Sequence, residues 1–146
     1  MQYLIEALAT RTRSANDALM QSSLFLFFVG ALGKKNPPPK PQATFVSIGD
    51  VHGCADLLDQ LLDKLTGEAP STAIVFVGDY IDRGPNSAQV LRHLMGLTES
   101  HPGGVICLMG NHEAMCLDFL DEVPGAGEIW FRNGGQQTLK SFGISS

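Results

Sequence analysis

Three short apolar segments, each closed by a glycine, recur between stretches with helical spacing in this chain. The apolar segments span residues 43–48, 73–77 and 105–109. The helical stretches cover residues 55–65, 87–97 and 112–120. Alternation of strand and helix predicts an α/β fold, in which right-handed crossovers join the strands of a parallel βαβαβ sheet. Segments that are apolar throughout are typical of parallel strands covered on both faces.

The ends of the chain differ from this regular middle. Residues 128–142 predict one or two short helices, broken at two consecutive glycines. Residues 34–42 contain four prolines and three lysines, which predicts an extended linker because proline removes backbone donors and blocks helix. We therefore expect a helical or apolar N-terminal extension with its linker over residues 1–42 and a main domain over residues 43–146.

The longest apolar run, residues 24–32, is too short to span a bilayer, which takes about 20 apolar residues in a helix. Three interpretations stay open for it. It could be the apolar part of a signal peptide, because two arginines precede it; it could be a helix that packs on the domain or a partner; or it could belong to no folded unit. We expect no membrane span and a cytoplasmic protein.

Charge and cysteine content narrow the functional class. The 146 residues include 15 acidic and 10 basic side chains, a net charge of −5. A mildly acidic chain is poorly suited to binding nucleic acid through its phosphates, although one or two local cations could hold a small phosphorylated substrate. The three cysteines are scattered without metal-binding spacing, so a reducing compartment is the simpler interpretation.

Polar motifs follow each predicted strand, in the order Gly-Asp-Val-His-Gly (49–53), Gly-Asp-Tyr-Ile-Asp-Arg-Gly (78–84) and Gly-Asn-His-Glu (110–113). Ligands of open α/β sheets bind at the carboxyl ends of the strands, so these motifs are expected to converge. Together they offer oxygen and imidazole donors and no thiolate. The donors are Asp50, His52, Asp79, Asn111 and His112.

This donor set suits manganese, iron, zinc or magnesium better than a structural cysteine-rich zinc site. Asp79, in the middle motif, could bridge two ions through its two oxygens. Two metals about 3.5–4 Å apart are a common device for displacement at phosphorus, because they polarise phosphoryl oxygens and supply hydroxide near neutral pH.

The remaining motif residues suggest roles toward a phosphate. The Arg83 guanidinium can bind phosphate oxygens in a bidentate way. His112 could act as a general acid for the leaving alkoxide, oriented by Asp82. Ordinary alternatives are a simple turn for the first motif, a surface ion pair for Asp82 and Arg83, and a helix N-cap role for Asn111, with Glu113 favouring the first helical turn.

The three motifs resemble the signatures of the calcineurin-like metallophosphoesterases. The match is to the phosphoprotein-phosphatase branch, whose signatures are GD-x-HG, GD-x-x-DRG and GNHE. Residues 130–135 (Trp-Phe-Arg-Asn-Gly-Gly), followed by Thr138 and Leu139, also resemble bacterial members of this branch. The resemblance covers about residues 44 to 144 and implies the N-terminal half of an αββα sandwich.

The resemblance also implies residue roles and two divalent metal ions, with manganese the first choice. The first ion would be bound by Asp50 and His52, Asp79 would bridge, and Asn111 would bind the second ion and face the substrate phosphate. His112 would be the general acid paired with Asp82. Arg83 would hold phosphate.

Two departures from the family pattern affect these expectations. Met109 stands where many members have arginine. The second half of the family fold supplies two further histidines and an arginine, whereas this sequence ends at Ser146, and His93 and His101 are expected at the surface. We therefore expect a truncated domain with an incomplete second metal site and an uncovered sheet face that could drive self-association.

Three functions remain open at this point. The first is a metal-dependent hydrolase of phosphate monoesters, most similar to a serine/threonine protein phosphatase, using metal-bound hydroxide and His112. The second is a dinucleoside polyphosphate hydrolase. The third is a catalytically silent fragment or a module that binds metal or phosphate.

Overall fold

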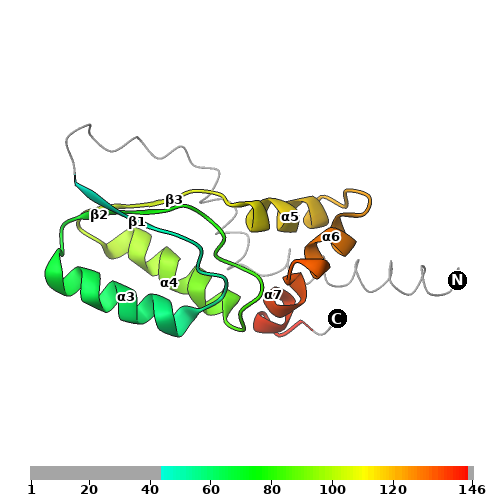
Figure 1. The fold of residues 1–146 in the computed structure, drawn as a ribbon, viewed down its shortest axis with the longest axis horizontal. Helices are drawn as coiled ribbons and strands as arrows, with labels where there is room; N and C mark the ends of the chain where they lie inside the picture. Colours follow the sequence, from blue (N-terminus) through cyan, green and yellow to red (C-terminus); the bar gives the residue numbers. More distant parts are fainter. Residues whose placement is uncertain (1–43, 145–146) are drawn as a thin grey trace, which may run out of the picture.

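A computed structural model of the chain describes residues 44–144, which form one parallel three-stranded sheet and five helices (Figure 1). The predicted extension, linker and apolar run over residues 1–42 lie outside the described residues. The strands are β1 (Phe45–Ile48), β2 (Ala73–Phe76) and β3 (Val105–Cys107), in the order β1-β2-β3. Both pairings are parallel, as predicted, with Phe45 opposite Ala73 and Ile74 opposite Val105.

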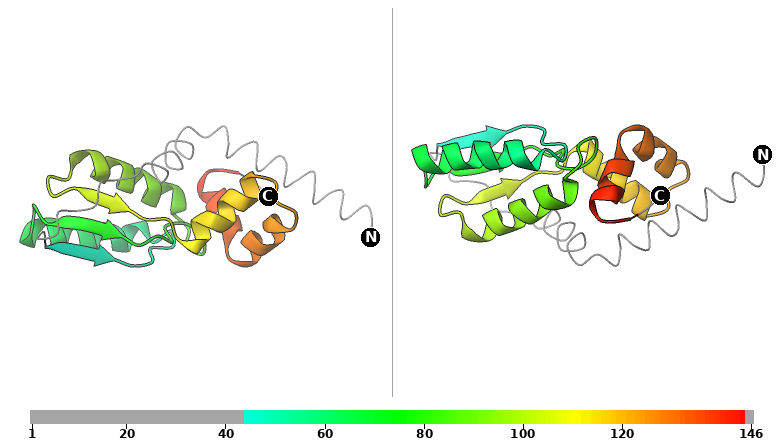
Figure 2. Two further views of the ribbon diagram at one scale, coloured as in Figure 1. Left: turned by 90° about the horizontal axis from the view of Figure 1, so that it is seen from above. Right: turned by 90° about the horizontal axis from the view of Figure 1, so that it is seen from below.

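The two crossover helices, α3 (Ala55–Glu68) and α4 (Ser87–Ser100), lie on the same face of the sheet (Figures 1 and 2). Their apolar residues recur every three or four positions, so each helix presents one apolar stripe to the strands. Leu91 of α4 is fully buried. In α3, Leu58 is buried but Leu57 is 65% exposed, so not every leucine of this helix faces the core.

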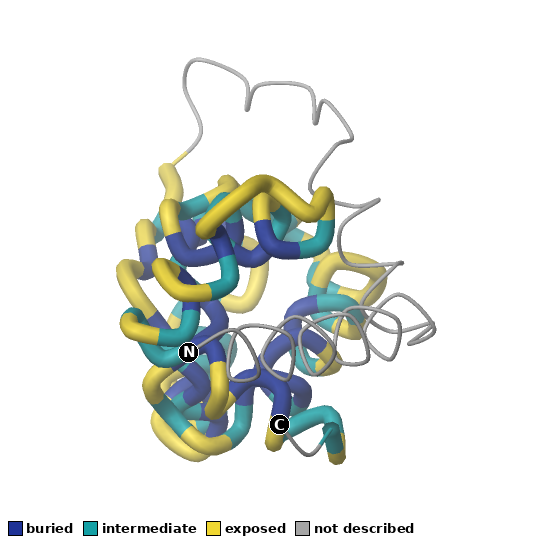
Figure 3. Tube along the Cα trace, turned by 90° about the vertical axis from the view of Figure 1, so that its right-hand side faces the viewer, coloured by how far each residue is buried: buried dark blue, intermediate teal, exposed yellow. Residues whose placement is uncertain are grey.

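The opposite face of the sheet is open among the described residues. Ile74 and Phe76 of β2 are buried under the helices, and Val77 just beyond them alternates to the other side and is exposed. Phe45 and Leu108 are also exposed. The expectation of strands covered on both faces is therefore wrong for this part of the chain, and the expected uncovered face is present. In Figure 3, exposed segments run along the top of the described trace and buried segments lie beneath them.

Three shorter helices gather beyond the carboxyl ends of the strands (Figures 1 and 2). They are α5 (Asn111–Leu120), α6 (Ala126–Arg132) and α7 (Gly135–Ser141). The predicted break at the two glycines falls between α6 and α7. Trp130 and Leu139 are fully buried, so these helices extend the core to the strand ends. In the described residues no helix is both long and apolar enough to cross a membrane.

Candidate metal centre

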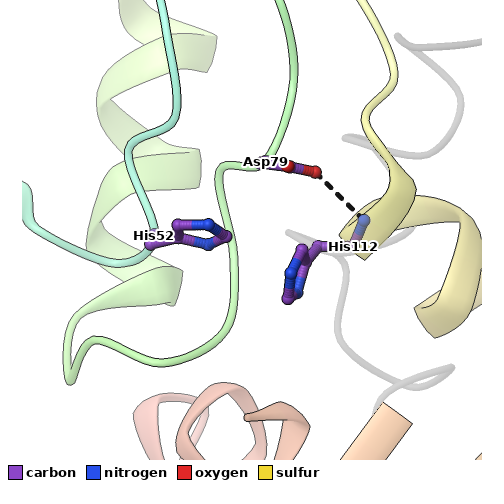
Figure 4. Close-up of side chains that lie close together, drawn as sticks. All are labelled: His52, Asp79 and His112. Atoms are coloured by element: carbon purple, nitrogen blue, oxygen red, sulfur yellow. Dashed lines mark hydrogen bonds between the residues drawn. The ribbon is translucent and has the colours of Figure 1, made fainter. Parts of the chain in front are cut away.

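Side chains from all three strand ends meet at one point. His52 follows β1, Asp79 follows β2, and His112 lies in the first turn of α5 (Figure 4). Their metal-ligating atoms all lie within 4.8 Å of one another. The rings of His52 and His112 meet edge to face, with centroids 4.6 Å apart. The predicted convergence of the three motifs is therefore present in the fold.

The loops that carry these side chains have an unusual backbone. His52, Asp79, Asp82 and Arg83 have positive φ values of 44°, 56°, 71° and 65°. Each such conformation costs about 1–3 kcal/mol in a non-glycine residue and persists only where the surroundings enforce it. Here the Asp79 carbonyl accepts hydrogen bonds from the N–H groups of Val51 (3.0 Å) and His52 (2.9 Å), which tie the first loop to the second.

The start of α5 is built around the Asp79 carboxylate. Its Oδ1 accepts a hydrogen bond from the backbone N–H of His112 at 3.0 Å. A Cβ at Gly110 would lie 2.2 Å from the same oxygen, so only glycine permits this approach. Gly110 is also the residue before the helix, which places Asn111 at the first helical position and excludes the N-cap role considered for it.

Glu113 has a larger role than that of a first-turn acid. Its buried carboxylate accepts hydrogen bonds from four backbone N–H groups. The donors are Asp79 (2.7 Å), Tyr80 (2.8 Å), Gly110 (2.9 Å) and Ile81 (3.4 Å). Burial raises the pKa of Glu113, and these hydrogen bonds oppose that shift. The side chain thus joins the loop after β2 to the helix after β3.

Both site histidines use Nδ1 for an internal contact. His52 Nδ1 lies 2.9 Å from the Ile81 carbonyl oxygen, and His112 Nδ1 lies 2.7 Å from Asp82 Oδ2. A proton on each Nδ1 satisfies both contacts and leaves Nε2 as an acceptor. Arg83 supplies the matching donors, with Nη1 2.9 Å from His52 Nε2 and Nη2 3.1 Å from His112 Nε2.

The structure excludes the surface ion pair considered for Asp82 and Arg83, because the two side chains differ in burial and contact different partners. Asp82 is fully buried, whereas Arg83 is exposed. Burial raises the pKa of Asp82, opposed by hydrogen bonds from Thr138, His112 and Trp130. The arginine faces the two histidines, and the aspartate supports one of them from behind.

The other predicted ligands lie nearer the surface. Asp50 is exposed, and its Oδ2 is 3.7 Å from His52 Nε2. Asn111 is also exposed and follows Gly110 at the site.

His93 and His101, the two other histidines of the chain, lie away from the carboxyl ends of the strands, as expected. Nδ1 of His93 is 2.6 Å from Asp59 Oδ1, and His101 is the residue that caps the C-terminal end of α4.

Two site residues were not identified from the sequence. Trp130 Nε1 and Thr138 Oγ1 both donate to the buried Asp82 carboxylate. The only signal was the resemblance of residues 130–135 and Thr138 to bacterial phosphatases, which by itself gave no role. These contacts join positions 48 and 56 residues apart, beyond the reach of a periodicity argument.

The donors fit a divalent metal ion. Two imidazoles and a carboxylate suit manganese, iron, zinc or magnesium, as the sequence predicted. Histidines that bind metal through one ring nitrogen commonly donate the other N–H to a carbonyl or carboxylate, and His52 and His112 both show this arrangement. His52, Asp79 and His112 form the group that could hold an ion.

The structure is therefore an α/β domain with a parallel sheet and, at its strand ends, a histidine and aspartate group that could hold a metal ion. The chain belongs to the calcineurin-like phosphoesterase family, whose sequence profile matches residues 43–144. This match confirms the family resemblance inferred from the three motifs.

Relatives with two kinds of name are similar to part of this chain. Serine/threonine-protein phosphatase 2 of Salmonella typhimurium (strain LT2) is 36% identical over 88 residues, covering 60% of this chain and 37% of that protein. The Escherichia coli (strain K12) protein of the same name is 38% identical over the same coverage. The symmetrical bis(5'-nucleosyl)-tetraphosphatase of Pseudomonas fluorescens (strain SBW25) is 36% identical over 71 residues, 49% of this chain and 24% of that protein. The matches thus span 37% of the two protein phosphatases and 24% of the tetraphosphatase.

Proposed function

We propose that residues 43–146 form a metal-dependent phosphoesterase domain that hydrolyses phosphate monoesters, preceded by an extension over residues 1–42. The observation that carries this proposal is the convergence of His52, Asp79 and His112 within 4.8 Å, with the Arg83 guanidinium against both histidines. Metal donors beside a bidentate cation are what a bound phosphate requires.

Two divalent ions would be held by the motif residues, with manganese the first candidate. Asp50 and His52 would bind one ion, Asp79 would bridge, and Asn111 would bind the second. Such ions would polarise the phosphoryl oxygens and lower the pKa of a coordinated water.

The protein groups around this centre would orient the substrate and move its proton. Arg83 and Asn111 would bind phosphate oxygens at the exposed side of the site. His112, with Nδ1 directed at Asp82, turns Nε2 toward the same side, so a proton on Nε2 could pass to the leaving oxygen. Asp82 would keep the imidazole in this orientation.

The favoured substrate is a phosphorylated protein, because the protein phosphatase relatives match a longer part of the chain than the tetraphosphatases do. Dinucleoside polyphosphates are the second candidate, since tetraphosphatase relatives match the same chain with similar identity. We place the protein in the cytoplasm and expect no nucleic acid partner. Self-association through the open sheet face, around Phe45 and Leu108, is a further part of the proposal.

The activity is tested with the full chain, Mn²⁺ and three substrates: an aryl phosphate, a phosphoserine peptide and diadenosine tetraphosphate. Asp79→Asn removes a ligand charge and His112→Asn removes the acid, so both variants should lose most turnover. An equal rate in the parent and both variants would refute the proposal. The ratio of phosphopeptide to tetraphosphate turnover decides between the two substrate classes.

Metal binding is measured separately by titration calorimetry and elemental analysis. Two ions per chain that are lost in Asp79→Asn would support the dinuclear site. Bound metal without turnover on any of the three substrates would instead identify the chain as a binding module. Sedimentation velocity of the same sample tests self-association, which a monomer at all concentrations would exclude.

A further inference from the structure

The Asp82 carboxylate is held by residues from three different helices. It is fully buried and accepts hydrogen bonds from His112 of α5, Trp130 of α6 and Thr138 of α7. We infer that Trp130 and Thr138 are positioning residues, which orient the Asp82 carboxylate and, through it, the His112 ring. This inference rests on the proposed function for its catalytic consequence, but not for its structural one.

Thr138 fixes both the backbone and the side chain of Asp82. Its Oγ1 accepts a hydrogen bond from the Asp82 N–H at 2.8 Å and donates to Asp82 Oδ1 at 2.7 Å. Ser87 Oγ also accepts from the Asp82 N–H, at 3.2 Å. The Thr138 hydroxyl therefore binds both the backbone N–H and the carboxylate of Asp82, a residue whose φ of 71° is otherwise unfavourable. Packing alone would not supply either contact, because both need the hydroxyl.

Trp130 supplies a donor whose direction is fixed by its surroundings. The buried indole lies against Phe119 and Phe131, with ring centroids 4.9 and 5.6 Å away. A Cβ at Gly135 would lie 2.4 Å from the ring, so α7 begins in direct contact with the indole. Held in this way, Nε1 lies 2.8 Å from Asp82 Oδ2 and 3.0 Å from Oδ1.

These contacts leave the carboxylate one orientation. Oδ1 is bound by Thr138 and Trp130, while Oδ2 is shared between Trp130 and Nδ1 of His112. An aspartate fixed in this way keeps the proton of neutral His112 on Nδ1 and Nε2 turned toward His52 and Arg83. Rotation of the carboxylate would release the ring and allow the opposite tautomer.

The test uses variants that remove one donor and keep most of the side-chain volume. Trp130→Phe removes the indole N–H, and Thr138→Val removes the hydroxyl. Thr138→Ser keeps the hydroxyl and should rescue the loss. Leu139→Val is the matched control, because Leu139 is fully buried next to Thr138 and has no polar group.

The first measurement is the tautomer of His112 in the metal-free full chain, from long-range ¹H–¹⁵N NMR of the histidine rings. We expect a single Nδ1–H tautomer in the parent, Thr138→Ser and Leu139→Val, and exchange between tautomers in Trp130→Phe and Thr138→Val. An unchanged Nδ1–H tautomer in both of the latter variants would overturn the inference. This result does not depend on catalysis, so it stands if the proposed function fails.

The second measurement is kcat and KM with Mn²⁺ and an aryl phosphate. Trp130→Phe and Thr138→Val should each lower kcat about 10-fold or more with little change in KM, as residues supporting a site from behind commonly do. In an Asp82→Asn background, Trp130→Phe should change kcat less than twofold further. Additive losses in the two backgrounds, or an equal loss in Leu139→Val, would show that Trp130 acts through packing alone.

Discussion

The strand-and-helix part of the molecule (residues 45–107) and the helical part (residues 111–144) contribute differently to the site. The first part presents side chains: His52 and Asp79 stand at the ends of its strands on loops with positive φ. The second part holds them: Glu113 binds the loop of Asp79, and Trp130 binds Asp82. The first part thus supplies His52 and Asp79 from its loops and α5 adds His112, whereas buried polar contacts made by the later helices orient these side chains.

Leu91→Ala should break the scaffold without altering the site, and it carries the largest expected loss of stability. Leu91 is fully buried in α4 and is not one of the metal donors, and its truncation should lower the free energy of unfolding by about 2–5 kcal/mol. Urea unfolding measures this loss. Calorimetry on the folded variant should give an unchanged affinity for Mn²⁺. A large fall in affinity would show that the two parts are not separable.

Glu113→Gln should affect both stability and the site. The amide offers one acceptor where the carboxylate offered two, so buried N–H groups of the Asp79 loop lose partners at a cost of about 1–3 kcal/mol. We also expect Mn²⁺ affinity to fall about 10- to 100-fold. Glu128→Gln is the control, because Glu128 is exposed and pairs with the exposed Arg132 in α6. Equal stability and equal Mn²⁺ affinity in the two variants would contradict the role assigned to Glu113.

Gly135→Ala should disturb the packing of the helical part around Trp130. The added methyl group would meet the Trp130 ring at 2.4 Å, and overpacking of this kind costs about 1–3 kcal/mol. Gly96→Ala in α4 is the matched control, since a Cβ there meets nothing within 4 Å and alanine favours helix. Thermal unfolding should show a lower Tm for the first variant and an equal or higher Tm for the second. The reverse order would contradict the packing described for Trp130.

The smallest expected effect is a change in the alkylation rate of the Cys107 thiol in β3 of the strand-and-helix part. Burial raises the pKa of Cys107 to about 11, and because only the thiolate is nucleophilic, alkylation by iodoacetamide at pH 8 should be slower than that of free cysteine. The rate should rise as pH approaches 11 and should reach that of free cysteine in urea. Mass spectrometry of digested protein gives the rate at this position. Fast labelling of the native chain at pH 8 would show that β3 is less protected than its burial indicates.

Local patterns in the chain were sufficient for most of the scaffold. The glycine-ended apolar runs predicted β1, β2 and β3 to within two residues, and helical spacing predicted α3 and α4 with C-terminal ends about one turn short. The prediction that helices cover both faces of the sheet was wrong, because an apolar run does not indicate which face of its strand has another element packed on it. The exposure of Leu57 has a related cause, since the five leucines of α3 form a stripe wider than the contact of this helix with the sheet.

The donors of the site follow directly from the order of residues. A parallel sheet brings its strand ends together, so any polar residues after consecutive strands must converge, and His52, Asp79 and His112 do so. The contacts that orient Asp82 behind these donors depend instead on how α6 and α7 pack. Contacts such as Trp130 to Asp82 and Thr138 to Asp82 cross 48 and 56 residues of chain, and neither spacing nor propensity encodes them. Such contacts are fixed when buried polar groups find partners in the folded core, because an unpaired group there is costly.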